Sequence, residues 1–316
     1  MTAKEKIPVL AVVGPTASGK TALGVSLAEY FNGEVVSADS MQIYKGMSIA
    51  TAKPTIEEMK GIPHHLIGFL DMNKSFSVAD YVKIAGDSIK DIHKRGKQPI
   101  VVGGTGLYVS SLLENIQFAE TTSNLVLREE LTAFAKEHGA EMLHNKLKEL
   151  DPEAAENIHP NNIVRVVRAI EVCIETGEKF SIHKAQSRLL ETPYNYCIVG
   201  IDYANRDDLY ERINMRVDKM IECGLIDEAY AVWSDGGIKT ASNAIGYKEL
   251  VPYFEKIKTL DACIDEIKLQ TRHYAKRQLT WFRKNKQIQW LILDKSDNLK
   301  KIQEKCIKVI AKSKVL

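Results

Sequence analysis

The sequence has no apolar run long enough to cross a membrane, and its cysteines lack the spacings that bind zinc. A membrane-spanning helix needs about 20 consecutive apolar residues, and no such run occurs. We expect no secretion signal, because the short apolar stretch near the N-terminus leads directly into a glycine-rich loop. The five cysteines are scattered, without a C-x-x-C pair. These absences predict a protein of the reducing cytoplasm with no disulfide framework, no zinc site and no membrane partner.

Neither sign of charge predominates, since the net charge of the 316 residues is only +2. No internal repeat or low-complexity stretch is present. Hydrophobic residues make up 45% of the chain, which is typical of a globular protein with a substantial core. The length suits one large domain or two ordinary ones.

What the sequence does contain is a phosphate-binding loop. Residues 14–21 read GPTASGKT, a full match to G-x-x-x-x-G-K-[ST], between the apolar run Ile7–Val13 and a helical pattern. In such loops backbone N–H groups at a helix N-terminus surround phosphate oxygens, a lysine adds positive charge and a hydroxyl ligates magnesium. An ordinary glycine-rich turn is the alternative. The expected phosphate-binding residues are Gly14, Pro15, Thr16, Ala17, Ser18, Gly19, Lys20 and Thr21, with Thr21 as the Mg²⁺ ligand.

Strand and helix patterns alternate around this loop. Such alternation predicts the α/β class, with a P-loop NTPase-like parallel sheet that carries helices on both faces. An exposed basic helix is expected to close the chain. Further strands are expected at 34–38, 99–102, 196–201 and 289–293, and helices at 78–94, 206–223, 226–233 and 260–284.

Residues 120–193 show helical patterns without strand patterns. Helices are expected at 124–137, 140–150 and 161–176, the last of them ended by Gly177. We therefore predict an inserted all-helical domain at 120–193, within a catalytic core formed by 1–119 and 194–316.

Two more polar segments follow predicted strands, where ligands of parallel sheets bind. One contains Asp39, and the other is Gly103-Gly104-Thr105-Gly106. A carboxylate beside a phosphate site holds magnesium or accepts a proton from a nucleophile. A turn-capping role for Asp39 is the alternative, and the residues alone leave both open. We expect the strand before Asp39 to lie one position from the phosphate-loop strand.

A series of segments then points to a family. In order they are GPTASGKT (14–21), SADSMQIYKGMSIATAKP (37–54), IPHHLI (62–67), FSVADY (76–81), GGTGLY (103–108), RAIEV (168–172), AIGYKEL (244–250) and TRHYAKRQLTWFR (271–283). Together they resemble the bacterial tRNA dimethylallyltransferases, also called tRNA isopentenyltransferases, over nearly the whole chain. The sequence departs from the family at Ser48, Ala50 and Ser110, where Asp, Gly and a basic residue are more common.

The resemblance implies an enzyme that transfers a dimethylallyl group from dimethylallyl diphosphate to N6 of adenine 37, next to the anticodon. Its tRNAs read codons that start with U, and its products are N6-(dimethylallyl)adenosine and diphosphate. The phosphate loop would bind this donor, with Mg²⁺, rather than ATP. Lys20 and Arg216 would face the diphosphate, Asp39 would accept or orient the N6 proton, and Thr105 would contact tRNA near the reacting base. A helix N-cap is the alternative for Thr105, and a solvated helix charge for Arg216.

The strongest charge asymmetry lies near the C-terminus. No acidic residue occurs between Ile267 and Leu293, and aromatic residues are interleaved with the basic ones. This pattern fits contact with a phosphate backbone, and a solvated helix face is the alternative. The resemblance implies a monomer that binds the tRNA anticodon stem-loop, with further contacts from the insertion. The expected tRNA-binding residues are Asp39, Ser40, Met41, Gln42, Thr105, Arg128, Arg165, Arg168, Arg272, Lys276, Arg277 and Arg283.

Three other functions are weighed against this one. A small-molecule kinase predicts a magnesium-binding acid after the strand at 99–102, where the chain instead has Gly103-Gly104-Thr105. A prenyltransferase for free adenine nucleotides would need neither the insertion nor the basic segment. Asp39 beside a complete phosphate loop argues against a non-enzymatic RNA-binding module. His64 and His65 are expected to be structural residues or loop contacts, because adjacent side chains rarely serve one metal.

Overall fold

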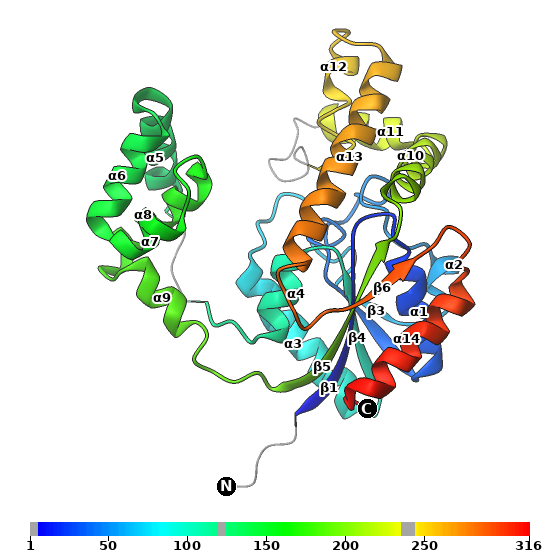
Figure 1. Cartoon of the computed structure of the whole chain (residues 1–316). Helices are drawn as coiled ribbons and strands as arrows, with labels where there is room; N and C mark the ends of the chain where they lie inside the picture. The colour runs from blue at the N-terminus through cyan, green and yellow to red at the C-terminus, as the bar shows by residue number, and fades with distance from the viewer. Residues whose placement is uncertain (1–5, 119–123, 235–243) are drawn as a thin grey trace, which may run out of the picture. The chain divides into compact units, whose positions relative to one another are not determined.

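The chain divides into two compact units in a computed structural model that describes residues 6–118, 124–234 and 244–316 (Figure 1). Met1–Leu113 and Thr192–Leu316 form the core unit, and Glu114–Glu191 forms the insertion unit. The division therefore comes after residue 191, two residues before the expected boundary. The expected boundary at 119/120 lies outside the described residues. Among the described helices, none is both long and apolar enough to span a membrane.

The core unit is built on a parallel sheet with the strand order β3-β2-β4-β1-β5-β6. The α/β class is thus confirmed. One expectation is wrong: β4 lies between β1 and β2, so Asp39 follows a strand two positions from the phosphate-loop strand. The helix before β4 returns the chain across the sheet, and β4 then pairs with β2 on one side and β1 on the other. The strands are β1 (Ile7–Val13), β2 (Gly33–Ser37), β3 (His64–His65), β4 (Gln98–Gly103), β5 (Tyr194–Tyr203) and β6 (Gln289–Leu293).

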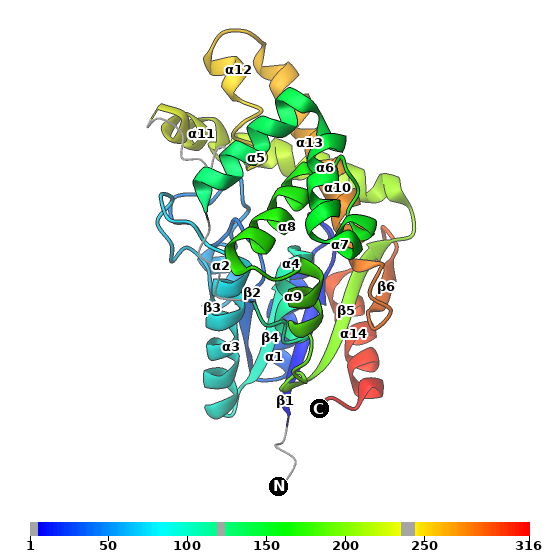
Figure 2. The ribbon, with the colours of Figure 1, turned by 90° about the vertical axis from the view of Figure 1, so that its left-hand side faces the viewer.

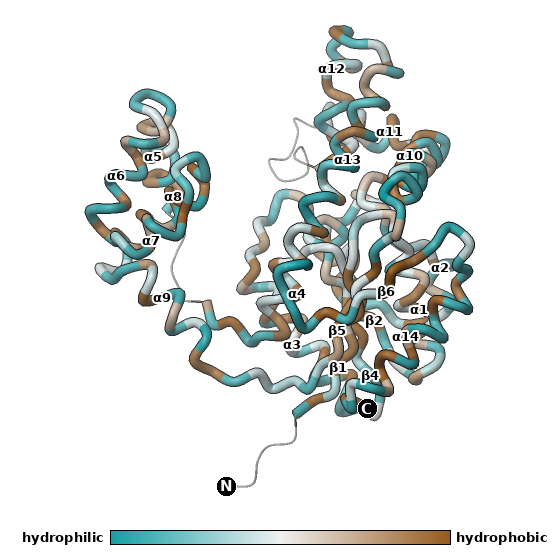
Figure 3. Tube along the Cα trace, viewed as in Figure 1, coloured by the Kyte–Doolittle hydropathy of each residue, from teal (hydrophilic) through white to brown (hydrophobic). Residues whose placement is uncertain are grey.

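Helices cover both faces of this sheet, as expected. Successive residues of β1 alternate between two cores: Val9 packs in one with α3 and α4, and Leu10 in the other with α1 and α14. Figure 1 shows α3 and α14 on opposite sides of the strands, Figure 2 looks onto the sheet from the α3 side, and hydrophobic residues follow the strands (Figure 3). The expected exposure of the last helix is wrong for one of its faces, where Cys306 and Ile310 are buried. The helices are α1 (Lys20–Tyr30), α3 (Val78–Lys94), α4 (Gly106–Leu113) and α14 (Leu299–Ser313).

A second group of helices stands beyond the carboxyl ends of the strands. Its core joins buried residues of these helices, such as Val217 and Ile267, to Ile43 and Met47 of the segment after β2. The longest of them, α13, runs from this group down to the strand ends (Figure 1). The group consists of α10 (Arg206–Glu222), α11 (Leu225–Ser234), α12 (Val251–Phe254) and α13 (Leu260–Phe282), and the short α2 (Ile56–Met59) follows the same segment.

Helices are the only regular secondary structure among the described residues of the insertion unit. It has its own core, in which Leu143, Leu147 and Val166 are fully buried. Gly177 ends α8 in the left-handed conformation (φ 69°), as predicted. Two short helices were not predicted, because each is too short to show a periodic pattern. The helices are α5 (Leu125–His138), α6 (Ala140–Leu150), α7 (Pro152–Asn157), α8 (Ile163–Thr176) and α9 (Phe180–Gln186).

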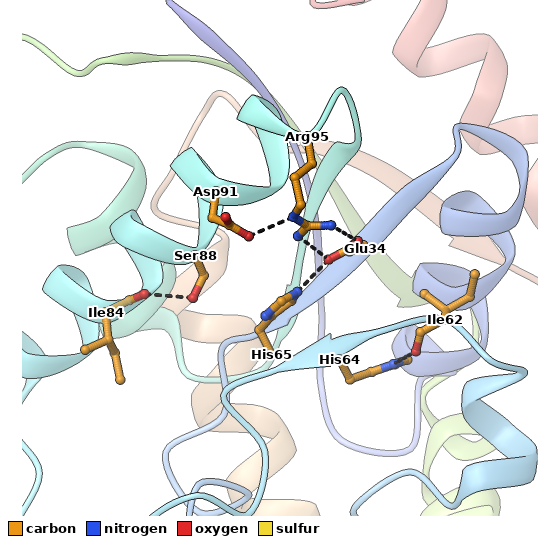
Figure 4. A network of polar contacts seen from close by, with 8 residues as sticks. All are labelled: Glu34, Ile62, His64, His65, Ile84, Ser88, Asp91 and Arg95. Carbon is orange, nitrogen blue, oxygen red and sulfur yellow. Dashed lines mark hydrogen bonds and ion pairs between the residues drawn. The ribbon is translucent and has the colours of Figure 1, made fainter.

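A buried carboxylate ties the β3 edge of the sheet to α3 (Figure 4). Glu34 of β2 is 4% exposed and accepts hydrogen bonds from Arg95 Nη2 (2.8 Å) and His65 Nε2 (2.7 Å). Arg95, and to a lesser extent His65, hold the pKa of Glu34 at about 2. His64 contacts the carbonyl of Ile62 through Nδ1. Both histidines therefore bind protein groups, as expected of structural residues.

Candidate active site at the carboxyl ends of the strands

Three loops from neighbouring strands meet at one edge of the sheet. They follow β2, β4 and β1, which are consecutive in the strand order. Residues of all three loops line a cavity of about 360 Å³ that also receives side chains from α10 and α13. The predicted site residues that line it are Thr16, Lys20, Thr21, Asp39, Ser40, Met41, Gln42, Arg216 and Arg277.

The phosphate loop turns sharply before α1 begins at Lys20. A Cβ atom at Gly14 would lie 2.8 Å from the carbonyl oxygen of Ile201, so the loop passes too close to β5 for any side chain there. Gly19 precedes the helix in the left-handed conformation (φ 89°). Ser18 is buried, and its hydroxyl has no hydrogen-bond partner among the described residues. The N-terminus of α1 thus lies at the cavity beside Thr16, Lys20 and Thr21, an arrangement that suits an anion.

Lys20 is half-buried, and its Nζ donates to the carbonyl oxygen of Pro15 in the same loop (2.6 Å). Burial and the positive charge of Arg216 lower the pKa of Lys20 to about 7, against the opposing effect of Asp39. Burial also lowers the pKa of Arg216, again opposed by Asp39. Two cations and one carboxylate therefore act on one another inside the cavity. An anionic ligand there would restore the protonated form of the lysine.

Asp39 makes turn-capping contacts with one carboxylate oxygen and leaves the other oxygen without a hydrogen bond in the described part of the chain. Its Oδ1 accepts hydrogen bonds from the backbone N–H groups of Met41 (2.9 Å) and Gln42 (3.2 Å), which is a turn-capping arrangement. No hydrogen bond among the described residues uses Oδ2. Because Asp39 also lines the cavity, this second oxygen can bind a proton or a metal ion there.

Thr105 occupies the position before α4, and its hydroxyl serves the neighbouring loop. Its Oγ1 accepts a hydrogen bond from the backbone N–H of Ser40 (3.0 Å). Its own N–H donates to the carbonyl oxygen of Ala38 (3.1 Å). Thr105 thus ties the loop after β4 to the loop that carries Asp39.

The cavity is lined by charged side chains and by a set of apolar ones, here called the apolar wall. The charged ones include Lys20 of the phosphate loop, Asp39 and Arg216. The ligand that suits this combination has an anionic head and an apolar tail. The wall is formed by Ile213, Val217, Met220, Leu225, Ala244, Ile245 and Ile267, from α10, α11, α13 and the segment before α12.

Magnesium fits these residues as an ion shared with a ligand. No cluster of three or more His, Cys, Asp or Glu side chains that could hold a metal occurs in the described part of the chain. Mg²⁺ commonly keeps several waters and binds through one or two protein groups plus substrate phosphates. Thr21 and Asp39 are the oxygen-bearing side chains beside the phosphate loop that could take this part.

Comparison with known proteins shows the family. The family model described as IPP transferase matches residues 42–285. The chain belongs to the IPP transferase family. A tRNA dimethylallyltransferase of Bacillus subtilis (strain 168) is 49% identical over 288 residues, which cover 90% of each chain. Another, of Caldanaerobacter subterraneus subsp. tengcongensis, is 46% identical over 308 residues, or 96% of this chain and 98% of that protein.

Solved structures agree with this membership. The full-length tRNA isopentenylpyrophosphate transferase from Bacillus halodurans has a TM-score of 0.70 at 44% identity and covers 98% of both chains. A eukaryotic dimethylallyltransferase described as acting on tRNA has a TM-score of 0.79 at 30% identity, over 95% of this chain and 77% of that one. The family and the fold expected from the sequence are therefore confirmed.

In this member of the family the basic residues of α13 differ in their surroundings. Arg272 Nη1 donates to Asn214 Oδ1 (2.8 Å), and Arg283 Nη2 forms an ion pair with the buried Asp202 (2.6 Å). Lys276 and Arg277 are exposed. The structure thus gives the first two residues partners within the protein. Lys276 is exposed outside the cavity lining, whereas Arg277 is exposed and also lines the cavity.

The insertion unit shows a similar contrast. Arg128 and Arg168 both form ion pairs with Glu171, whose side chain is fully buried (2.8 and 2.6 Å). Arg165 is exposed on the same helix as Arg168. The pairing with Glu171 was not predicted, because residues 128 and 171 meet only after α5 packs against α8.

Three further side chains organise the site and were not predicted. Arg212 Nε donates to the carbonyl oxygen of Ala17 (3.0 Å), a residue of the phosphate loop with a left-handed backbone (φ 62°). Glu228 accepts from the backbone N–H groups of three successive residues, 48–50, so this contact does not depend on the unusual Ser48 and Ala50 side chains. Gln278 of α13 contacts two of the loops. Only Gln278 lies in a segment of family resemblance, and nothing in the sequence indicates its partners.

Proposed function

We propose that this chain transfers a dimethylallyl group from dimethylallyl diphosphate to N6 of adenine 37 in tRNAs that read codons starting with U. Transfer of a prenyl group to tRNA is supported by membership of the IPP transferase family and by the shared name of its relatives. The observation that carries the assignment is the composition of the cavity. Its phosphate loop and its apolar wall suit the two ends of this donor, and Asp39 lies at the same cavity.

The diphosphate of the donor would lie at the N-terminus of α1. Backbone N–H groups of the phosphate loop would bind its oxygens, and Lys20 and Arg216 would neutralise the charge that develops as the diphosphate leaves. Bound through Thr21 and the diphosphate, magnesium would supply additional positive charge to the leaving group. The five-carbon group would lie against the apolar wall.

The reaction forms two bonds, N6–C1 and O–H, and breaks two, C1–O and N6–H. N6 of the adenine attacks C1 of the dimethylallyl group, and the C1–O bond to the diphosphate breaks with its electron pair. The proton lost from N6 passes to Asp39 Oδ2, the oxygen left free by the turn. An exocyclic adenine amine is a weak nucleophile, so much of the rate would come from holding N6 in line with the C1–O bond, with Asp39 beside N6.

We assign the exposed basic residues Lys276, Arg277 and Arg165 to contact with the tRNA backbone. Their exposure leaves their charges accessible to phosphates. Arg272, Arg283, Arg128 and Arg168 are assigned the same ligand, in addition to the contacts that they make within the protein. The target adenine would have to leave the anticodon loop stack to reach the cavity. We further propose a monomer that acts in the cytoplasm, which light scattering and fractionation would test.

Radiolabelled dimethylallyl diphosphate separates this function from its alternatives. It is incubated in parallel with an unmodified tRNA that reads a U-initial codon, the same tRNA with guanine at position 37, AMP and ATP. We expect label only in the first tRNA. Transfer to AMP or ATP would identify an enzyme for free nucleotides, and phosphoryl transfer from ATP would identify a kinase; either result refutes the proposal.

A further inference from the structure

One amide side chain of α13 lies between two loops of the active site. Gln278 is 6% exposed. Its Oε1 accepts a hydrogen bond from the backbone N–H of Thr16 in the phosphate loop (2.8 Å). Its Nε2 donates to the carbonyl oxygen of Gly104 in the loop after β4 (3.0 Å). Residues far apart in the sequence are thus joined by a single side chain.

Both contacts are made to backbone groups, which fixes the orientation of the amide. A backbone N–H can only donate and a carbonyl oxygen can only accept. The side chain between them must therefore offer one acceptor and one donor at its tip. Glutamine does so in its neutral form, whereas a carboxylate offers only acceptors and a thioether offers no donor.

The helix that carries Gln278 is packed directly on the second loop. A Cβ atom at Gly104 would lie 2.2 Å from Gln278 Nε2, and one at Gly106 would lie 2.2 Å from Trp281 Cδ1. Leu279 packs in the same small core as Ala17 of the phosphate loop. The position of α13 relative to the two loops is therefore fixed by close packing as well as by the two hydrogen bonds.

The contact continues from Gly104 to the loop that carries Asp39. The next residue, Thr105, bonds to Ser40 through its hydroxyl and to Ala38 through its N–H. A Cβ atom at Gly103 would lie 2.2 Å from the carbonyl oxygen of Ala38, so these two loops are also in direct contact. The phosphate loop, Gln278, the loop after β4 and the Asp39 loop thus form one continuous chain of contacts.

We propose that Gln278 is a positioning residue that sets the distance between the phosphate loop and the Asp39 loop. The inference rests on the proposed function, in which the first loop holds the donor and the second accepts the proton. Gln278 acts through backbone groups of the two loops. Its loss would leave each loop able to bind its own ligand but would misalign them, and small misplacements of reacting groups cost about 100-fold in rate.

Gln278→Met removes the donor and most of the acceptor strength while keeping the length of the side chain. In single-turnover transfer we expect a fall of about 100-fold, with the Kd values of dimethylallyl diphosphate and of tRNA changed less than about threefold. The matched control is Gln270→Met on the same helix. Among the described residues Gln270 hydrogen-bonds to Glu266, one turn away, and to no active-site loop, so this variant should keep the wild-type rate.

A double variant shows whether Gln278 acts through Asp39. If it does, Gln278→Met should cost much less in an Asp39→Asn background than in the wild type, because the group that it aligns has already lost its function. A merely structural role predicts that the two rate losses multiply. Multiplicative losses, or a loss of ligand binding equal to the loss of rate, would overturn the proposal.

Gln278→Glu supplies a test that does not depend on Gln278→Met being folded. The ionised carboxyl accepts from Thr16 but repels the carbonyl of Gly104. Once protonated, it again has one donor and one acceptor. The ratio of variant to wild-type rate should therefore rise as the pH falls through the pKa of the new carboxyl, and a ratio independent of pH would contradict the proposal.

Wild-type transfer in the same assay separates the two hypotheses. A wild-type protein without transfer refutes the proposed function and this inference with it. Equal transfer by the wild type and Gln278→Met refutes the inference alone.

Discussion

At the scale of single residues, the site depends on two cations and one carboxylate that share a cavity. Lys20 has its pKa lowered by burial and by Arg216, and the opposite charge of Asp39 only partly compensates. The cavity therefore holds more positive than negative charge and favours an anionic ligand. An anionic donor removes this conflict, because it satisfies both cations at once.

Donor binding should take up a proton above pH 7. The pKa of Lys20 is about 7 without the donor, and the diphosphate should raise it by stabilising the ammonium form. Below pH 7 Lys20 is already charged, so affinity should change little; above pH 7 it should fall by up to tenfold per pH unit. Calorimetric titration with dimethylallyl diphosphate, without tRNA, in buffers of different ionisation enthalpy measures the proton uptake.

Lys20→Arg is the control for this titration, since arginine stays charged throughout the range. It should bind the donor without proton uptake at pH 8. Wild-type binding at pH 8 without proton uptake would show that the lysine is already protonated in the free protein.

Asp39→Asn should separate the proton-acceptor role from a metal-ligand role. The amide keeps the size of the side chain and can still accept the turn hydrogen bonds to Met41 and Gln42, but it is a very poor base. We expect nearly unchanged Kd values for tRNA and donor, and a chemical step slower by about 100- to 10,000-fold. Single-turnover transfer is measured across a magnesium titration. Recovery to near wild-type rates at high magnesium would show that Asp39 mainly holds the metal.

At the scale of elements, the short strand β3 depends on a neighbouring ion pair. It contains only His64 and His65, and the network of Glu34, Arg95 and His65 links it to β2 and α3 (Figure 4). A strand of two residues makes few backbone hydrogen bonds with its neighbouring strand. The network therefore holds this edge of the sheet.

Glu34→Gln should destabilise the core unit at neutral pH and not at low pH. The folded pKa of Glu34 is about 2, below its ordinary value of 4.5. Its contribution is thus fully present above pH 4.5 and is lost as the pH falls towards 2. We expect a loss of about 2–3 kcal/mol in the free energy of unfolding at pH 7.

Urea denaturation followed by tryptophan fluorescence measures this loss, because the three tryptophans, Trp233, Trp281 and Trp290, all belong to the core unit. The difference between variant and wild type should shrink between pH 5 and pH 3. A difference that is the same at both pH values would mean that the charge of Glu34 contributes nothing.

Helix α13 presents one face to the active site and another to solvent. Neutralising Lys276 and Arg277 to glutamine should weaken tRNA binding at low salt and reduce the slope of log affinity against log salt by at most about one unit per lost contact. Filter binding without donor measures both quantities. Lys300→Gln with Lys308→Gln, two exposed residues of α14, is the control of equal charge. Wild-type affinity and slope in the α13 variant would indicate a merely solvated helix face.

At the scale of the whole molecule, the chain has separate hydrophobic cores in its two units. The core of the insertion unit shares no residue with the cores around the sheet. Multidomain proteins of this kind commonly unfold in more than one step. The two units should therefore respond separately to core mutations.

Leu143→Ala should destabilise the insertion unit alone. Leu143 is fully buried in that core, and such truncations cost about 2–5 kcal/mol. Thermal unfolding followed by circular dichroism should show an earlier transition, while tryptophan fluorescence, which reports the core unit, should be unchanged. Ile89→Ala in α3, equally buried, should do the reverse. A shift of both signals by either variant would show that the units unfold together.

The sequence was sufficient to predict those features that depend on a short contiguous segment of the chain. The phosphate loop is a contiguous pattern, the helix Val78–Lys94 and the strand Gln289–Leu293 follow from periodicity, and both have the predicted bounds. Asp39 and Thr105 could be selected because each follows a buried strand. The family followed from several such segments in order.

The features that could not be predicted depend on the packing of segments far apart in the sequence, since no local pattern encodes which segments meet. The place of β4 between β1 and β2 results from the path of the chain across the sheet. The pairing of Glu171 with Arg128, and the contacts of Gln278 with Thr16 and Gly104, join residues that meet only when helices have docked. Burial then lowers the pKa of Lys20, because the cavity that desolvates it is assembled from loops and helices of the whole core unit.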